Sequence, residues 1–156
     1  MRCFFDTEFI DNPDYFALLS IGLIREDGQT YYAELDSTDR SQAVPWVRKN
    51  VLPLMKGPVK SREQICYDLV QFVGKKPEFW AYFASFDWVL LSRLYGSMLS
   101  VPETWPNFSN DILFIKGNYK LPKQTSIPHH ALNDAIWNKE CYDYIVEMNY
   151  EKILRS

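Results

Sequence analysis

The chain has 156 residues, of which 47% are apolar and 16% are aromatic, and its formal net charge is -3. This composition supplies an ample core for one domain and excludes a chain that is disordered through high charge and low hydrophobicity. It also excludes a global basic surface that coats nucleic acid through many phosphate contacts, so any nucleic-acid site must be local.

The first predicted element is a strand, RCFFD at residues 2–6, which leads into Asp6 and Glu8. Side chains alternate between the two faces of a strand, so these carboxylates point the same way. An isolated pair of this kind is most often a solvated polar face. The alternative is a site for a hard cation such as Mg²⁺, which takes carboxylate oxygens. Further acids from elsewhere in the chain would favour the cation site.

Two more strands are predicted at residues 16–26 and 29–35, with EDG as the turn between them. The fold is therefore expected to begin with three antiparallel strands. Residues 37–60 contain three prolines between short helical pieces. Ser61 and Gln64 resemble a capping box that opens an amphipathic helix running to about Val73.

A fourth strand, EFWAYF at residues 78–83, precedes a predicted helix at residues 85–96. Ser85 is the expected cap of this helix and Gly96 the expected stop. Asp87 lies in the first turn. Taken alone, it is an acid favoured by the positive end of the helix dipole.

The segment 97–128 is rich in loops and prolines, with one short predicted strand, DILFI at residues 111–115. From residue 129 the apolar residues recur at helical spacing, which predicts one long helix carrying Asp134. Alone, Asp134 reads as a solvated acid on an amphipathic helix. The order of elements predicts an α/β fold, with helices flanking a mixed five-stranded sheet in which three antiparallel strands come first and parallel strands are added.

Three segments together resemble the motifs of the DEDDh family of 3′-to-5′ exonucleases. They are Asp6-Thr7-Glu8 on the first strand, Phe86-Asp87 after the fourth strand, and HHALND at residues 129–134. The resemblance extends from residue 4 to about residue 138, and it is strongest to the small bacterial and phage exoribonucleases related to RNase T. It implies an RNase H-like fold and a single exonuclease domain over residues 1–156.

The resemblance also implies the roles of five residues. Asp6 would bridge two Mg²⁺ or Mn²⁺ ions about 4 Å apart, Glu8 and Asp134 would complete one ion site, and Asp87 would support the other. His129 is the expected general base, because a histidine with an ordinary pKa near ~6.5 takes up a proton at neutral pH. His130, four residues before Asp134, would have the better position if the helix already included both histidines. Pro128 favours His129, since proline is tolerated at a helix start but not inside a helix.

The expected function is therefore metal-dependent hydrolysis of RNA from its 3′ end, with release of 5′-mononucleotides. A DNA 3′ exonuclease of the proofreading type is the alternative, because contacts to the 2′-hydroxyl cannot be read from these motifs. A catalytically dead RNase H-like binding module is disfavoured, since all five motif residues are present. The expected partner is a 3′ end of RNA, single-stranded or in an overhang, with DNA as the alternative.

Aromatic side chains near the motifs are candidates for stacking on bases, a contact worth about 1–3 kcal/mol per base. The candidates are Phe9, Phe86, Trp88 and Trp105, each with core packing as the alternative, and Trp105 is expected to be exposed in its proline-rich loop. Many relatives carry His-Asn shortly before the F-D pair, where this chain has Tyr82-Phe83, so contacts made by that pair are not carried over.

Three lysines, Lys116, Lys120 and Lys123, are candidates to line the path of the strand, with a solvated loop as the equal alternative. Several relatives form homodimers, and the sequence leaves that possibility open. No stretch approaches the ~20 apolar residues of a membrane span, and Met1 leads directly into a strand without a secretion leader. Three widely spaced cysteines indicate a reducing compartment, so a cytoplasmic location without membrane contact is expected.

Overall fold

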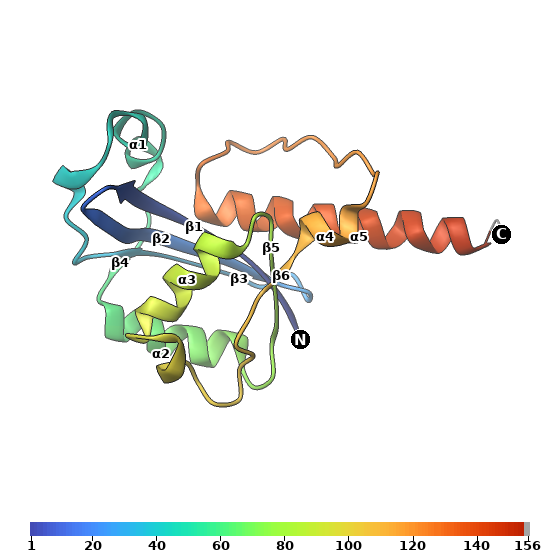
Figure 1. Ribbon diagram of the computed structural model, residues 1–156, viewed down its shortest axis with the longest axis horizontal. Coiled ribbons are helices and arrows are strands. Elements are labelled where there is room, and N and C mark those ends of the chain that lie inside the picture. The colour runs from blue at the N-terminus through green and yellow to red at the C-terminus, as the bar shows by residue number, and fades with distance from the viewer. Residues whose placement is uncertain (155–156) are drawn as a thin grey trace.

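The computed structural model describes residues 1–154, which form a mixed sheet with helices on both faces (Figure 1). The strands are β1 (Arg2–Asn12), β2 (Tyr15–Arg25), β3 (Thr30–Leu35), β4 (Val59–Lys60), β5 (Glu78–Ala81) and β6 (Asn110–Asp111). The α-helices are α1 (Pro45–Asn50), α2 (Arg62–Val73), α3 (Ser85–Leu94), α4 (Ile112–Lys116) and α5 (Ala131–Leu154). None of the helices in this part of the chain is both long and apolar enough to cross a membrane.

The sheet has the strand order β4-β3-β2-β1-β5-β6. β1 pairs antiparallel with β2, and β2 pairs antiparallel with β3, which confirms the predicted opening of three strands. The other pairings are parallel, namely β1 with β5, β5 with β6 and β3 with β4. The predicted number of strands was wrong, because residues 1–154 hold six strands rather than five. β4 was missed because it is only two residues long and directly follows Pro58.

The predicted strand DILFI was mostly wrong, because only its first residue, Asp111, belongs to a strand, β6, and the other four residues belong to α4. The Asp111 side chain accepts a hydrogen bond from the Leu113 backbone N–H at 2.8 Å and so caps α4, which begins at Ile112. Asp111 also accepts from the Ala84 N–H at 3.0 Å. Ala84 is the N-cap residue of α3. Ser85, which was predicted as the cap, is the first residue of the helix. The predicted cap of α2 is confirmed, since the Ser61 hydroxyl accepts from the Gln64 N–H at 3.2 Å.

The helices form two layers around the sheet. Figure 1 shows α5 along one face, with α2 and α3 on the other. Alternation along β1 explains this arrangement: Phe4 packs in one cluster with Ala135 and Ile145 of α5, whereas its neighbour Phe5 packs in another with Leu69 of α2. Each face of the central strand is thus covered by a helix, and Asp6 lies on the same face as Phe4, toward α5.

Gly22 determines how closely the start of α5 approaches the sheet. It is the cross-strand neighbour of Asp6. A Cβ at this position would lie 2.3 Å from the backbone nitrogen of Leu132 and 2.4 Å from the carbonyl carbon of Ala131. The missing side chain lets the first turn of α5 rest on β2, directly beside the acids of β1. Asp134, at the end of this first turn, is thereby carried to those acids.

Candidate metal centre

Three of the predicted acids meet at the start of α5. Asp6 and Glu8 come from β1, where a bulge between Glu8 and Phe9 shifts the register with β2. Asp134 comes from the first turn of α5. One carboxylate oxygen from each of the three lies within 4.8 Å of the others, and we call this group the carboxylate cluster. Carboxylate oxygens at this spacing form a donor set that suits a hard divalent cation.

Two hydrogen bonds hold the Asp134 carboxylate in place. The Gln124 side-chain amide donates to Oδ1 at 2.5 Å, and the His129 backbone N–H donates to Oδ2 at 2.9 Å. Both donors come from the segment 117–130, which arcs over α5 in Figure 1. The segment therefore orients one acid of the cluster.

Asp87 reaches β1 from the other side of the sheet. β5 pairs with β1 only at Arg2–Phe4, so the edge of β1 beyond Phe4 is open on that side. There the backbone N–H and the hydroxyl of Thr7 donate to Asp87 Oδ1 at 2.9 and 2.5 Å. Asp87 is buried, with 6% of its surface exposed. The structure thus brings three of the four predicted acids into one cluster and holds the fourth beside it, through the residue between Asp6 and Glu8.

Burial and mutual repulsion make these carboxylates hard to ionise. Burial raises the pKa of Asp6 well above its ordinary range, and the nearby acids Asp87, Glu8 and Asp134 raise it further. Burial also raises the pKa of Glu8 to about 8 and raises the pKa of Asp134. The pKa of Asp87 rises to about 6 through burial, although the two Thr7 hydrogen bonds lower it. A dication would neutralise the repelling charges, so the donors and the electrostatics of this site fit a divalent metal.

The two histidines have different surroundings. Both precede α5, which begins at Ala131. His129 has a φ of +65°, and its ring meets Trp46 edge to face at 4.8 Å between centroids. His130 instead stacks on Tyr32 at 4.5 Å, and its buried Nδ1 has no hydrogen-bond partner within residues 1–154. Both backbones bond to Asp134, since the His129 N–H donates to the carboxylate and the His130 carbonyl accepts from the Asp134 N–H at 3.0 Å. The rings differ, because only that of His130 packs on β3.

Two of the predicted stacking residues lie together beside the acids. Phe9 follows Glu8 and Phe86 precedes Asp87, and their rings stack at 5.8 Å with an interplanar angle of 22°. Phe86 is 54% exposed. One face of this pair is therefore open to solvent.

The two tryptophans behave as core residues. Trp88 is half-buried and packs 5.5 Å from Phe79. The predicted exposure of Trp105 was wrong, because its proline-rich loop folds back against α2 and only 5% of the residue is exposed. Its indole N–H donates to the Gly74 carbonyl at 2.8 Å, which satisfies the buried polar group.

The three candidate lysines differ in their contacts. Lys116, the last residue of α4, donates to the Tyr119 carbonyl at 3.3 Å. Lys120 and Lys123 are exposed on the segment that carries Gln124. These two lysines therefore lie on a segment that reaches the carboxylate cluster.

Four residues at the site were missed from the sequence. The one sequence signal for Thr7 was its position between the two acids of the first motif. Gly22 had a signal too, because a glycine inside a predicted strand marks a close backbone approach. Gln124 and Trp46 lie in segments without regular patterns, and their contacts depend on how those segments fold.

A family model described as the 3′-5′ exoribonuclease Rv2179c-like domain matches residues 1–146. The chain belongs to this family. Two proteins of Mycobacterium tuberculosis are each 37% identical to it over 146 residues, which is 86% of this chain and 87% of each relative. They are named 3′-5′ exoribonuclease MT2234.1 (strain CDC 1551 / Oshkosh) and 3′-5′ exoribonuclease Rv2179c (strain ATCC 25618 / H37Rv).

The fold is also found among solved structures. An example is the Pan2 catalytic unit (protease and nuclease domain) of Neurospora crassa, with a TM-score of 0.51 and 14% sequence identity. The match covers 99% of this chain and 29% of the Pan2 chain. This likeness confirms the predicted fold, and the family model with the two relatives confirms the resemblance to 3′-to-5′ exonucleases.

Proposed function

We propose that the chain is a divalent-metal-dependent 3′-5′ exoribonuclease that forms one exonuclease domain over residues 1–156, of which 155–156 lie outside the described part. It hydrolyses the last phosphodiester bond of RNA and releases nucleoside 5′-monophosphates. The carboxylate cluster beside Asp87 carries this proposal, because four closely spaced acids, two buried and two half-buried, need cations to be ionised together. Membership of the exoribonuclease family and the names of both relatives support it.

The acids of the site would hold two ions, Mg²⁺ or Mn²⁺. Asp6, Glu8 and Asp134 would bind one, and Asp6 would share the second with Asp87. When bound, such ions neutralise charge on the phosphate and on the leaving oxygen. The protein's own part is to fix the carboxylates: Thr7 orients Asp87, and the segment 117–130 orients Asp134.

Proton transfer is assigned to His129. As general base it takes a proton from the attacking water, whose oxygen bonds to phosphorus while the bond between phosphorus and the 3′ oxygen breaks. A proton from solvent then converts the leaving oxygen to a hydroxyl. The His129 N–H donates to the Asp134 carboxylate itself, whereas the His130 ring stacks on Tyr32, and this difference supports His129 in the role. Phe9 and Phe86 are proposed to stack on the terminal bases, since they form a partly exposed pair next to the acids.

The proposed substrate is RNA with a free 3′ end, single-stranded or in an overhang. A DNA exonuclease of the proofreading type remains the alternative, and the names of the relatives favour RNA. A cytoplasmic location is part of the proposal, because Cys3, Cys66 and Cys141 are all free thiols.

The test is one time course on 5′-labelled RNA and DNA oligonucleotides of the same sequence, with Mg²⁺, Mn²⁺ or EDTA. We expect a ladder that shortens from the 3′ end on RNA, requires the metal and is abolished by Asp6→Asn. Asp36→Asn, an exposed acid outside the cluster, is the matched control and should cleave normally. Preferential shortening of DNA would establish the alternative, and unchanged cleavage in EDTA would refute the metal site.

A further inference from the structure

We propose that the RNA upstream of the cleaved nucleotide lies along a strip formed by Phe86, Phe16, Arg93 and Arg62, with its phosphates bound by the two arginines. We call these four residues the upstream strip. The inference rests on the proposed function and adds a binding site outside the carboxylate cluster. Its parts come from α3, the start of β2 and the start of α2.

The strip begins at the aromatic pair beside the acids. Phe16 meets Phe9 at 5.6 Å and Phe86 at 5.9 Å, in both cases edge to face, so three aromatic rings are in mutual contact. Phe86 is exposed, whereas Phe9 and Phe16 are partly buried. A terminal base stacked on Phe86 leaves the next nucleotide over Phe16.

Arg93 continues the strip along α3. It lies seven residues after Phe86, which is two helical turns on the same face and about 10 Å along the axis. Its guanidinium lies 6.0 Å from the centroid of Phe16, so Phe16 joins the aromatic end to the basic end. At this separation Arg93 serves a phosphate upstream of the one that is cleaved.

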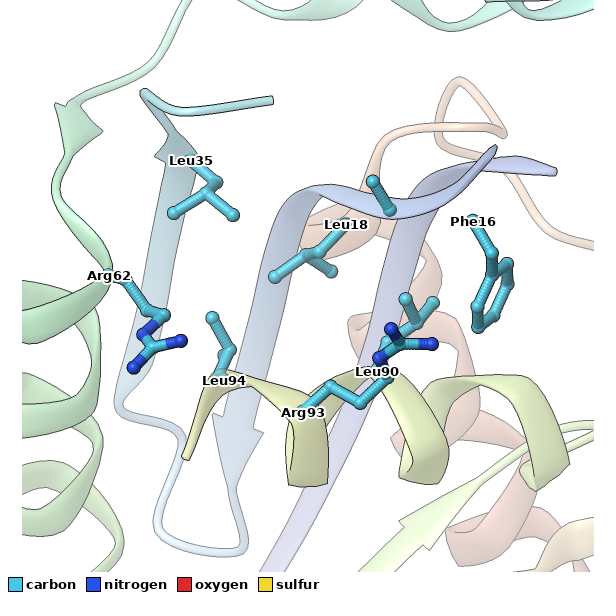
Figure 2. Close-up of a pocket in the computed structure, with 8 residues that line it drawn as sticks. Phe16, Leu18, Leu35, Arg62, Leu90, Arg93 and Leu94 are labelled. Carbon is cyan, nitrogen blue, oxygen red and sulfur yellow. The ribbon is translucent and has the colours of Figure 1, made fainter. Parts of the chain in front are cut away.

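The basic end of the strip surrounds a small pocket. Figure 2 shows Arg62 and Arg93 on either side of a floor that includes Leu18, Leu35 and Leu94. The pocket has a volume of about 120 Å³. It offers apolar contact to a sugar or to part of a base, with two guanidinium groups at its rim that match phosphate geometry.

These two arginines differ from the others in the described chain. Arg2, Arg25 and Arg40 pair with acids, and the Arg48 side chain donates to two backbone carbonyls. The Arg93 guanidinium, by contrast, makes no hydrogen bond or ion pair within residues 1–154. Arg62 has only a long ionic contact of 3.9 Å with its exposed neighbour Glu63.

The weak pairing of these two side chains leaves the charge of the strip available to an anion. The occupant that fits the whole strip is an RNA strand whose 3′ end is at the carboxylate cluster. Its bases can stack on the aromatic rings, and its phosphates can bind the arginines. The lysine-bearing segment over α5 is the competing path for the strand.

The test measures binding and turnover separately. Arg93→Gln and Arg62→Gln are compared with Lys75→Gln, an exposed cation on the loop after α2, as the matched control. Affinity for a labelled RNA dodecamer is measured by fluorescence anisotropy in EDTA over a range of salt concentrations. KM and kcat are then measured with Mg²⁺ on the dodecamer and on a dinucleotide.

Each arginine variant should weaken binding and raise KM for the dodecamer by about twofold to fivefold, the upper part of the scale of an exposed charge pair. The slope of log affinity against log salt should become shallower by about 0.7 for each phosphate that the variant no longer neutralises. Hydrolysis of the dinucleotide should stay unchanged, because its single phosphate is the one that is cleaved and none is left for Arg93 to bind. Every property of Lys75→Gln should also stay unchanged.

The opposing results are distinct. If the arginine variants bind like Lys75→Gln, or if Lys120→Gln with Lys123→Gln weakens binding instead, the upstream strip is refuted while the nuclease proposal stands. If the wild-type chain cleaves neither RNA but the arginine variants still weaken binding, the proposed function fails and the strip survives as an RNA-binding site. An equal KM increase on the dinucleotide would also overturn the strip.

Discussion

Replacing Glu8 by glutamine should stabilise the metal-free protein while abolishing its activity. Burial raises the pKa of Glu8 from 4.5 to about 8, with repulsion from Asp134 and Asp87 contributing to the rise. Near neutral pH the folded chain therefore keeps Glu8 protonated, whereas the unfolded chain ionises it. Glutamine resembles the protonated acid in shape and carries no such cost.

The size and the sign follow from proton linkage. Because the folded state binds more protons than the unfolded state, the free energy of unfolding of the wild type falls as pH rises from 4.5 toward about 8. At about 1.4 kcal/mol per pKa unit, the cost accumulated by neutral pH is about 3 kcal/mol. Glu8→Gln should therefore equal the wild type near the ordinary pKa of the acid and exceed it by about 3 kcal/mol at neutral pH.

The assay is urea unfolding followed by tryptophan fluorescence in EDTA, repeated across this pH range. Glu103→Gln, an exposed acid outside the cluster, serves as the control and should show no such pH-dependent gain. Saturating Mg²⁺ should stabilise the wild type more than Glu8→Gln, because a ligand that binds only the folded state adds to its stability. A stability difference that stays constant with pH would refute the reasoning.

Three further changes test other parts of the site. His129→Ala should slow turnover about 100-fold, the usual scale of a general base, and His130→Ala should change it little. If His130→Ala is instead the slower variant, His130 is the general base. Gly22→Ala should lose activity because its Cβ would collide with the backbone of α5, whereas Gly28→Ala, in open space but with a φ of +87°, should lose only about 1 kcal/mol of stability. Thr7→Val should move the acid limb of the pH–rate profile upward by removing a hydrogen bond that lowers the pKa of Asp87, and Thr7→Ser should restore it.

Patterns with a fixed geometric meaning predicted much of the site. Alternation along a strand placed Asp6 and Glu8 on one face, and helical spacing placed Asp134 on the helix that covers it. Pro128 indicated that the chain only enters the helix near His129, and α5 begins two residues later, at Ala131. In each case the local conformation determines the direction of the side chain, so the sequence is sufficient.

Where a feature depends on tertiary contacts, the sequence-based prediction was wrong or was not made. DILFI has the composition of a strand, but the Asp111 side chain caps a helix there and also binds the backbone before α3. Trp105 is buried because a distant carbonyl, that of Gly74, accepts its N–H. The role of Thr7 needs the edge of β1 left open by the short strand β5. None of these contacts has a signal within a window of neighbouring residues.

Release of nucleotides from linear and circular RNA of the same sequence tests the central claim most directly. The two RNAs are mixed with the wild-type chain and Mg²⁺, and the products are separated by chromatography. We expect nucleoside 5′-monophosphates from the linear RNA only, with the circle intact, and no products from either RNA with Asp6→Asn. Equal loss of the circle and the linear RNA would show an endonuclease and contradict the account.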